Sequence, residues 1–141
     1  METPQKESRR VRAVLDTHAA LYLALGSRAL GASAQRLLSD AAPEDLVISD
    51  VTLTETARLL SDGDITVNGS ALAWLENFAL GFQVQPVAPA IAWKAACYTF
   101  AHRDPCDRHI LATADILALP LVTVDRPLTA AAATVGVKVV W

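Results

Sequence analysis

The chain has 141 residues, of which 52% are hydrophobic and 19% are charged, and its net charge is −3 at pH 7. This length suits a domain with its own hydrophobic core, and the composition excludes a largely disordered chain. The acidic balance excludes general attraction to nucleic acid, so any nucleic-acid site needs local basic residues or metal ions.

The two cysteines, Cys97 and Cys106, form no CxxC or Cys/His pattern. We therefore expect neither a disulfide scaffold nor a zinc site, and we expect a cytoplasmic, reducing location. No apolar run reaches about eighteen residues, so a membrane span is not expected. Residues 1–10 are charged and lack the apolar core of a signal peptide. We expect them to form a flexible lead, followed by one domain over residues 11–141.

Short apolar runs alternate with helical patterns through the first part of the chain. Residues 11–15 predict a buried strand, and the following pattern predicts a helix that Gly26 stops. Asp50 or Thr52 is the expected cap of a later helix. Up to residue 86, the expected elements are a strand at 11–15, helices at 17–25 and 32–38, a strand at 46–49, helices at 50–60 and 70–80, and an edge strand at 82–86.

The second part continues the alternation and predicts the fold class. The expected elements are a helix at 88–101, a helix from Pro105 to 118, a strand at 119–124, a helix at 126–133 and a last strand at 137–141. Continuous apolar strands that alternate with helices are typical of a parallel sheet covered on both faces. In such sheets, ligands bind beyond the carboxyl ends of the strands.

Asp107 has an unusual place on its predicted helix. Apolar residues lie three, four, seven, ten and eleven positions after it, so at roughly 100° per residue they form one stripe with the carboxylate in its middle. A buried unpaired charge is unfavourable, so Asp107 needs a metal ion, an arginine or several N–H donors. This position is the first indication of a site.

Asp16, Glu55, Asp107 and Asp125 are the candidate site residues, and each also has a purely structural interpretation. Asp16 and Asp125 follow strands and suit helix N-caps. Glu55 fits a capping box with Thr52 in the pattern T-x-x-E. Asp107 lies in a first helical turn, where a carboxylate complements the helix dipole. For each residue, the site interpretation and the structural interpretation both stay open.

Asp104 is best explained as a cap, because Pro105 then occupies the first helical position. The other four carboxylates would repel one another at a shared rim and would raise one another's pKa. A hard divalent cation such as magnesium relieves that repulsion. The helix at 105 reaches the rim only if the preceding helix and loop return the chain there.

Four segments resemble the acidic motifs of PIN-domain proteins, and most of all VapC-type toxins of prokaryotic toxin–antitoxin pairs. They are VLDTHAALYLAL, ISDVTLTETARLL, HRDPCDRHILATA and LPLVTVDRPL. The resemblance spans residues 11–141. It implies a three-layer α/β/α sandwich around about five parallel strands, consistent with typical sheet size. It also implies an endoribonuclease that uses Mg²⁺ or Mn²⁺ held by Asp16, Glu55, Asp107 and Asp125.

The same resemblance implies a homodimer and inhibition by a cognate, VapB-like antitoxin, with RNA as the substrate. Thr17 and Thr123 match hydroxyl positions beside the site. Cys106 replaces a commonly large apolar residue, and we expect it to pack as a small hydrophobe. Leftover apolar surface on the helices at 18–25 and 51–60 predicts an interaction surface.

Basic residues near the motifs are candidate phosphate contacts: Arg103, Arg108, Arg126, His102 and His109. For Arg103 and His109 a solvated surface is the favoured interpretation, and His102 is interpreted as a helix-end residue. Two rival functions remain. One is a module that binds RNA or antitoxin without catalysis. The other is a haloacid-dehalogenase-type phosphatase, which needs an aspartate where this chain has His18.

Overall fold

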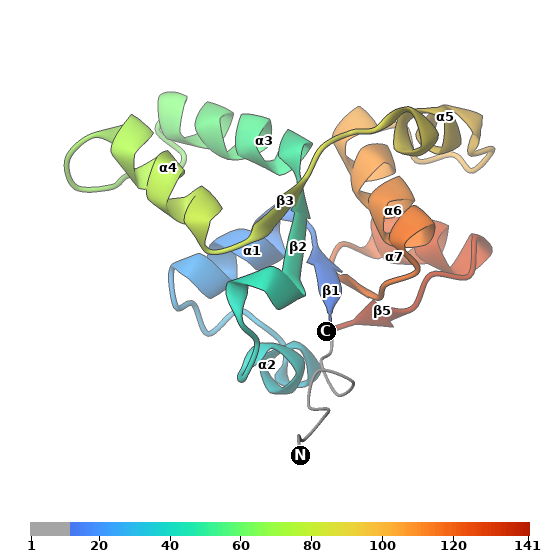
Figure 1. Cartoon of the computed structure of the whole chain (residues 1–141), viewed down its shortest axis with the longest axis horizontal. Coiled ribbons are helices and arrows are strands. Elements are labelled where there is room, and N and C mark those ends of the chain that lie inside the picture. Colours follow the sequence, from blue (N-terminus) through green and yellow to red (C-terminus); the bar gives the residue numbers. More distant parts are fainter. Residues whose placement is uncertain (1–11) are drawn as a thin grey trace, which may run out of the picture.

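Five parallel strands form the centre of the molecule in a computed structural model that describes residues 12–141 (Figure 1). Their order across the sheet is β3-β2-β1-β4-β5. The strands are β1 (Ala13–Leu15), β2 (Leu46–Ser49), β3 (Gln83–Gln85), β4 (Leu121–Val122) and β5 (Val139–Val140). The predicted parallel α/β class is confirmed. The predicted lead at 1–10 lies outside the described residues.

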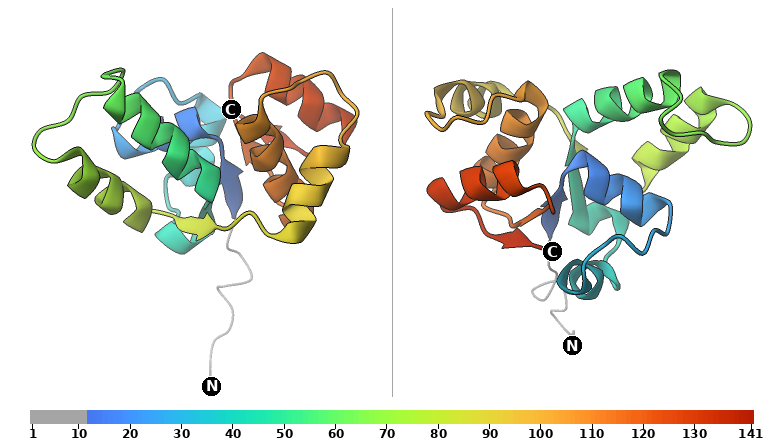
Figure 2. Two further views of the ribbon diagram at one scale, coloured as in Figure 1. Left: turned by 90° about the horizontal axis from the view of Figure 1, so that it is seen from above. Right: turned by 180° about the vertical axis from the view of Figure 1, so that it is seen from behind.

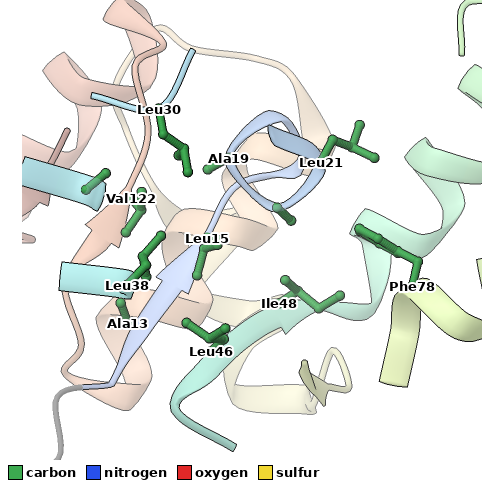
Figure 3. Close-up of a cluster of buried hydrophobic side chains, with 12 residues drawn as sticks. Ala13, Leu15, Ala19, Leu21, Leu30, Leu38, Leu46, Ile48, Phe78 and Val122 are labelled. Carbon is green, nitrogen blue, oxygen red and sulfur yellow. The ribbon is translucent and has the colours of Figure 1, made fainter. Parts of the chain in front are cut away.

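Alternate residues of the central strands enter two different cores. Leu15 and Ile48 point to one face of the sheet, and Figure 3 shows them with side chains from the first helices and from Phe78. Val14, Val47 and Leu121 belong to the cluster on the opposite face. The alternation follows from the two-residue period of a strand, and because every one of these side chains is buried, the strands read as continuous apolar runs.

Helices cover both faces and give three layers (Figures 1 and 2). One group lies on the β2 and β3 side of the molecule: α1 (Thr17–Ala24), α2 (Ala32–Leu38), a 3-10 turn at Pro43–Asp45, α3 (Asp50–Ser61) and α4 (Ala71–Leu80). The other lies on the β4 and β5 side: α5 (Pro89–Cys97), α6 (Pro105–Leu117) and α7 (Arg126–Thr134). Among residues 12–141, no helix is both long and apolar enough to cross a membrane.

Several expected boundaries and one expected helix cap were wrong. The helix predicted at 88–101 ends at Cys97, because Tyr98 is extended at φ −60° and ψ 134°. The strands predicted at 119–124 and 137–141 each shrink to two residues, since β4 and β5 pair only at Leu121↔Val139 and Val122↔Val140. The cap of α3 is Ser49, whose hydroxyl accepts from the Val51 N–H, and neither Asp50 nor Thr52 serves as the cap.

Candidate active site

Asp16 directly follows β1, and both of its carboxylate oxygens are engaged. Oδ1 accepts the Ala19 N–H at 2.8 Å, which makes Asp16 the N-cap of α1. Oδ2 accepts the Thr123 hydroxyl at 2.5 Å, and the residue is only 5% exposed. Burial raises the pKa of Asp16 against these hydrogen bonds, and the charge of Asp125 raises the pKa further. The capping interpretation is confirmed, and it leaves the carboxylate facing the ends of β1 and β4.

Thr123 connects the ends of two neighbouring strands. Its hydroxyl donates to Asp16 and accepts the Asp125 N–H at 3.0 Å. Asp125 in turn caps α7, since its Oδ2 accepts the Leu128 N–H at 2.8 Å. The hydroxyl position predicted at 123 therefore holds Asp16 and Asp125 in one hydrogen-bonded arrangement at the carboxyl end of the sheet.

Asp107 reaches the same end of the sheet from α6. Asp104 caps this helix by accepting the Cys106 N–H at 2.9 Å, as the Asp-Pro pattern predicts. Asp107 lies in the first turn, and its Oδ2 is 2.9 Å from His102 Nε2. Burial is the main cause that raises the pKa of Asp107 to about 6, and the charges of Asp104 and Asp125 add to it.

Three side chains form a tight group of potential metal ligands. One atom each from His102, Asp107 and Asp125 lies within 4.8 Å of the other two. The chain therefore does return to the rim before α6, which was the open condition for placing Asp107 there. Asp16 and Glu55 stand outside this group. Asp16 is connected to it through Thr123 and Asp125.

Glu55 does not form the predicted capping box with Thr52. Instead, Oε1 of Glu55 accepts the Thr17 hydroxyl, and the Thr17 and Thr52 hydroxyls are 3.1 Å apart. Thr52 lies inside α3, which Ser49 caps, and its buried hydroxyl contacts the Thr17 hydroxyl on α1. Glu55 thus reaches from α3 to the side chain of Thr17, the residue that follows Asp16 in the chain.

Arg108 is a structural residue, and the expectation of a phosphate contact is wrong. Its guanidinium donates to the carbonyl oxygens of Ala95 at 3.0 Å, His102 at 2.8 Å and Tyr98 at 2.6 Å. The same group lies 4.9 Å from the centre of the Phe100 ring. Five planar donors suit this task, and the three bonds fix the segment between α5 and α6.

The other basic candidates divide into two kinds. His109 Nδ1 lies 2.6 Å from the Pro105 carbonyl within its own helix, which agrees with the structural interpretation. Arg103 and Arg126 are exposed near the start of α6 and α7.

Cys106 is half-buried, and burial together with nearby carboxylates raises the pKa of its thiol to about 11. Its thiol is thus protonated at neutral pH, as expected for a small hydrophobe.

His102 was predicted as a candidate phosphate contact and interpreted as a helix-end residue. Its contact with Asp107 was not predicted. The available signal was its position: it opens the HRDPCD stretch and lies five residues before a carboxylate on a core-facing stripe. That signal does not reveal the turn that brings the ring back.

The residues of this rim fit a hard divalent cation. Among residues 12–141, no lysine or arginine forms an ion pair with Asp16, Asp107 or Asp125. Burial and mutual repulsion raise the pKa values of Asp16 and Asp107, which is the condition that a cation relieves. Carboxylate oxygens are the ligands that Mg²⁺ and Mn²⁺ prefer.

The all-parallel α/β/α sandwich and the acidic side chains at its carboxyl rim are the features of the PIN domain class. The PIN domain family model matches residues 13–133, so the chain belongs to the PIN domain family. None of the curated proteins matches the chain.

Several solved structures share this fold. The chain is 21% identical to FitAcB from Neisseria gonorrhoeae, with a TM-score of 0.63 over 90% of this chain and 95% of that one. It is 18% identical to DNA-bound VapBC from Salmonella typhimurium, with a TM-score of 0.66 over 92% and 96%. For the sarcin-ricin loop cleaving toxin VapC20 of Mycobacterium tuberculosis, the values are 20% and 0.59 over 84% and 94%.

Proposed function

We propose that this PIN domain is a divalent-metal-dependent endoribonuclease and the toxin of a VapC-type toxin–antitoxin pair. The observation that carries the proposal is the connected set of carboxylates at the carboxyl rim, which has no lysine or arginine partner among the described residues. The resemblance of this chain to toxins of known structure supports the toxin role, because the chain shares their fold over most of its length. A cytoplasmic location follows from this role.

In this proposal, Asp16 and Asp107 bind the principal Mg²⁺ or Mn²⁺ directly, and Asp125 binds the same ion or a second one. When bound, such an ion lowers the pKa of water, orients a phosphodiester and stabilises the leaving oxygen. Thr123 fixes the orientation of Asp16 by donating to its Oδ2. Asp125 keeps Oδ1 for the ion, since the Leu128 N–H engages Oδ2.

Glu55 has the role of orienting the attacking water or of holding the ion through a water. Its Oε1 accepts the Thr17 hydroxyl, so Oε2 is the oxygen that can turn towards the rim. Thr17 is adjacent to Asp16 in the chain, and it therefore sets the position of Glu55 relative to the first carboxylate. Arg103 and Arg126, which are exposed, are the remaining candidates for contacting the RNA phosphates.

An antitoxin and a second copy of this chain are the proposed protein partners. The chain resembles toxins whose solved structures are toxin–antitoxin complexes, among them one from Klebsiella pneumoniae. We therefore expect a cognate, VapB-like antitoxin and a homodimer. Exposed Leu72 and Leu80 on α4 and Leu25 after α1 provide apolar surface for such contacts.

Cleavage of an RNA pool by purified, antitoxin-free protein tests the proposal. The parent protein should cut RNA with Mn²⁺ or Mg²⁺ and stop when EDTA is added. Asp16→Asn should remove at least about 99% of this activity, the scale expected for the loss of a group central to an electrostatic site. Asp40→Asn, at an exposed turn, is the matched control and should cut normally.

Two outcomes would contradict the proposal. If Asp16→Asn cleaves as well as the parent, the activity belongs to a contaminant or to another site. If the parent binds RNA or an antitoxin tightly but never cleaves with any divalent ion, the protein is a binding module of the PIN fold.

A further inference from the structure

The imidazole of His102 lies among the carboxylates in a position that suits a ligand. Its Nε2 is 2.9 Å from Asp107 Oδ2. One potential ligand atom each from His102, Asp107 and Asp125 lies within 4.8 Å of the other two. Adjacent ligands of an octahedral ion with bonds of about 2.1 Å are roughly 3.0 Å apart. Nε2 and Oδ2 therefore already have the separation of two adjacent ligands of one ion.

The segment that carries His102 is fixed rather than loosely attached. Arg108 donates to the carbonyl of His102 and to that of Tyr98, so both ends of the 98–102 segment are held to α6. The side chain of His102 is 20% exposed, and that of Asp107 is 21% exposed. The ring is thus held at the rim by bonds that do not involve the ring itself.

We propose that His102 Nε2 is a direct nitrogen ligand of the rim cation, together with Asp107 and Asp125, and that it makes the site prefer Mn²⁺ over Mg²⁺. Both ions bind carboxylate oxygens, but Mg²⁺ is a hard cation that takes oxygen ligands, whereas Mn²⁺, a first-row transition ion, also accepts an imidazole nitrogen. The inference rests on the proposed function only in requiring that a divalent cation binds at this rim.

A second reading of the same contact gives His102 a positioning role. In that interpretation Nε2 carries a proton, and the N–H donates a hydrogen bond to Asp107. The ring then orients the carboxylate without touching the ion. One nitrogen cannot do both, because a metal ligand needs the lone pair and a donor needs the proton. The two readings therefore predict different spectra for the bound ion.

Pulsed electron paramagnetic resonance of Mn²⁺ bound to the full-length protein distinguishes them. The wild-type spectrum should show coupling to a ¹⁴N nucleus, and the coupling should disappear in His102→Ala. His109→Ala is the matched control, since that ring contacts a carbonyl of its own helix, and it should keep the coupling.

Affinity provides an independent measurement. His102→Gln retains an N–H donor for Asp107 but lacks the imidazole nitrogen. Titration calorimetry should show its Kd for Mn²⁺ weakened by on the order of tenfold, the smaller end of the loss caused by changes around metal ligands. Its Kd for Mg²⁺ should change less, so the preference for Mn²⁺ narrows.

The failures can be told apart. Bound Mn²⁺ without ¹⁴N coupling in the wild-type protein, or an unchanged Mn²⁺ preference in His102→Gln, would overturn the role of His102 and leave the proposed nuclease intact. If neither Mn²⁺ nor Mg²⁺ binds to the wild-type protein, the metal-dependent function fails as well.

Discussion

The Thr123 hydroxyl donates to Asp16 Oδ2 at 2.5 Å and joins the carboxyl ends of β1 and β4. Both residues are almost completely buried. A hydroxyl is a weak stabiliser of a carboxylate compared with a cation, so burial still raises the pKa of Asp16. The bond therefore orients the carboxylate without neutralising it, and the charge of Asp16 stays available for an ion.

Replacing Thr123 with valine should impair the site without changing its shape. Valine has nearly the volume of threonine but leaves Asp16 Oδ2 without a donor, which should destabilise the fold by about 2 kcal/mol. RNA cleavage should fall by at least about tenfold if the carboxylate rotates away from the ion. Chemical denaturation and cleavage assays measure the two effects.

Thr113→Val is the matched control, because the Thr113 hydroxyl is also buried but donates to the His109 carbonyl within α6. It should retain cleavage. Equal losses of activity in the two variants would show that Thr123 acts only through general stability.

The raised pKa of Asp107, about 6, predicts how stability depends on pH in the metal-free protein. The folded state binds this proton more tightly than the unfolded chain, whose aspartate has its ordinary pKa. Stability from this group is therefore complete below the ordinary pKa, falls as pH rises towards about 6, and stays lower above it.

Asp107→Asn should consequently melt higher than the parent in EDTA at about pH 7.5, and the advantage should vanish near pH 3.5. Adding Mn²⁺ at about pH 7.5 should stabilise the parent and not the variant. Thermal melts at both pH values with and without Mn²⁺ measure this. A variant that melts lower than the parent in EDTA at the higher pH would contradict the account.

Arg108→Lys should loosen the segment between α5 and α6. An ammonium group cannot reach three carbonyls in one plane, so we expect a loss of about 2 kcal/mol in the free energy of unfolding. Amide hydrogen exchange should quicken over residues 98–104. Arg103→Lys, an exposed neighbour, should change neither quantity. Unchanged exchange in Arg108→Lys would mean that the segment is fixed by other contacts.

Gly31 is required by the close approach of the C-terminal residue. A Cβ at position 31 would lie 2.5 Å from the backbone carbon of Trp141 and 2.6 Å from its Cδ1. Gly31→Ala should destabilise the fold by about 2 kcal/mol through this overlap. Gly81→Ala is the control, since its Cβ would come no closer than 3.4 Å to the Phe78 carbonyl. Urea denaturation compares them, and equal stabilities would show that Trp141 moves aside freely.

Much of the fold could be predicted from local sequence. Alternating buried strands and capped helices were visible because each depends on residues a few positions apart, as in the Asp104-Pro105 start of α6. The end of α5 was not visible. It depends on Arg108, a residue of the next helix, whose guanidinium donates to the carbonyl oxygens of Ala95 and Tyr98.

For the site, the sequence indicated the position of the three aspartates but not the long-range contacts of Glu55 and His102. Asp16, Asp107 and Asp125 follow strands or open helices, so the topology places them at one rim. The partner of Glu55 is Thr17, which is 38 positions away, and nothing local indicates that contact. The contact of His102 with Asp107 was not predicted for the same reason, because only the turn before α6 brings its ring to that carboxylate.

Anomalous diffraction from a crystal soaked in Mn²⁺ tests most directly whether Asp16, Asp107 and Asp125 hold a divalent cation. We predict a peak in direct contact with Asp16 and Asp107, with Asp125 bound to the same ion or to a second one. A peak elsewhere, or no peak in crystals that retain RNA-cleaving activity on dissolution in Mn²⁺, would contradict the account.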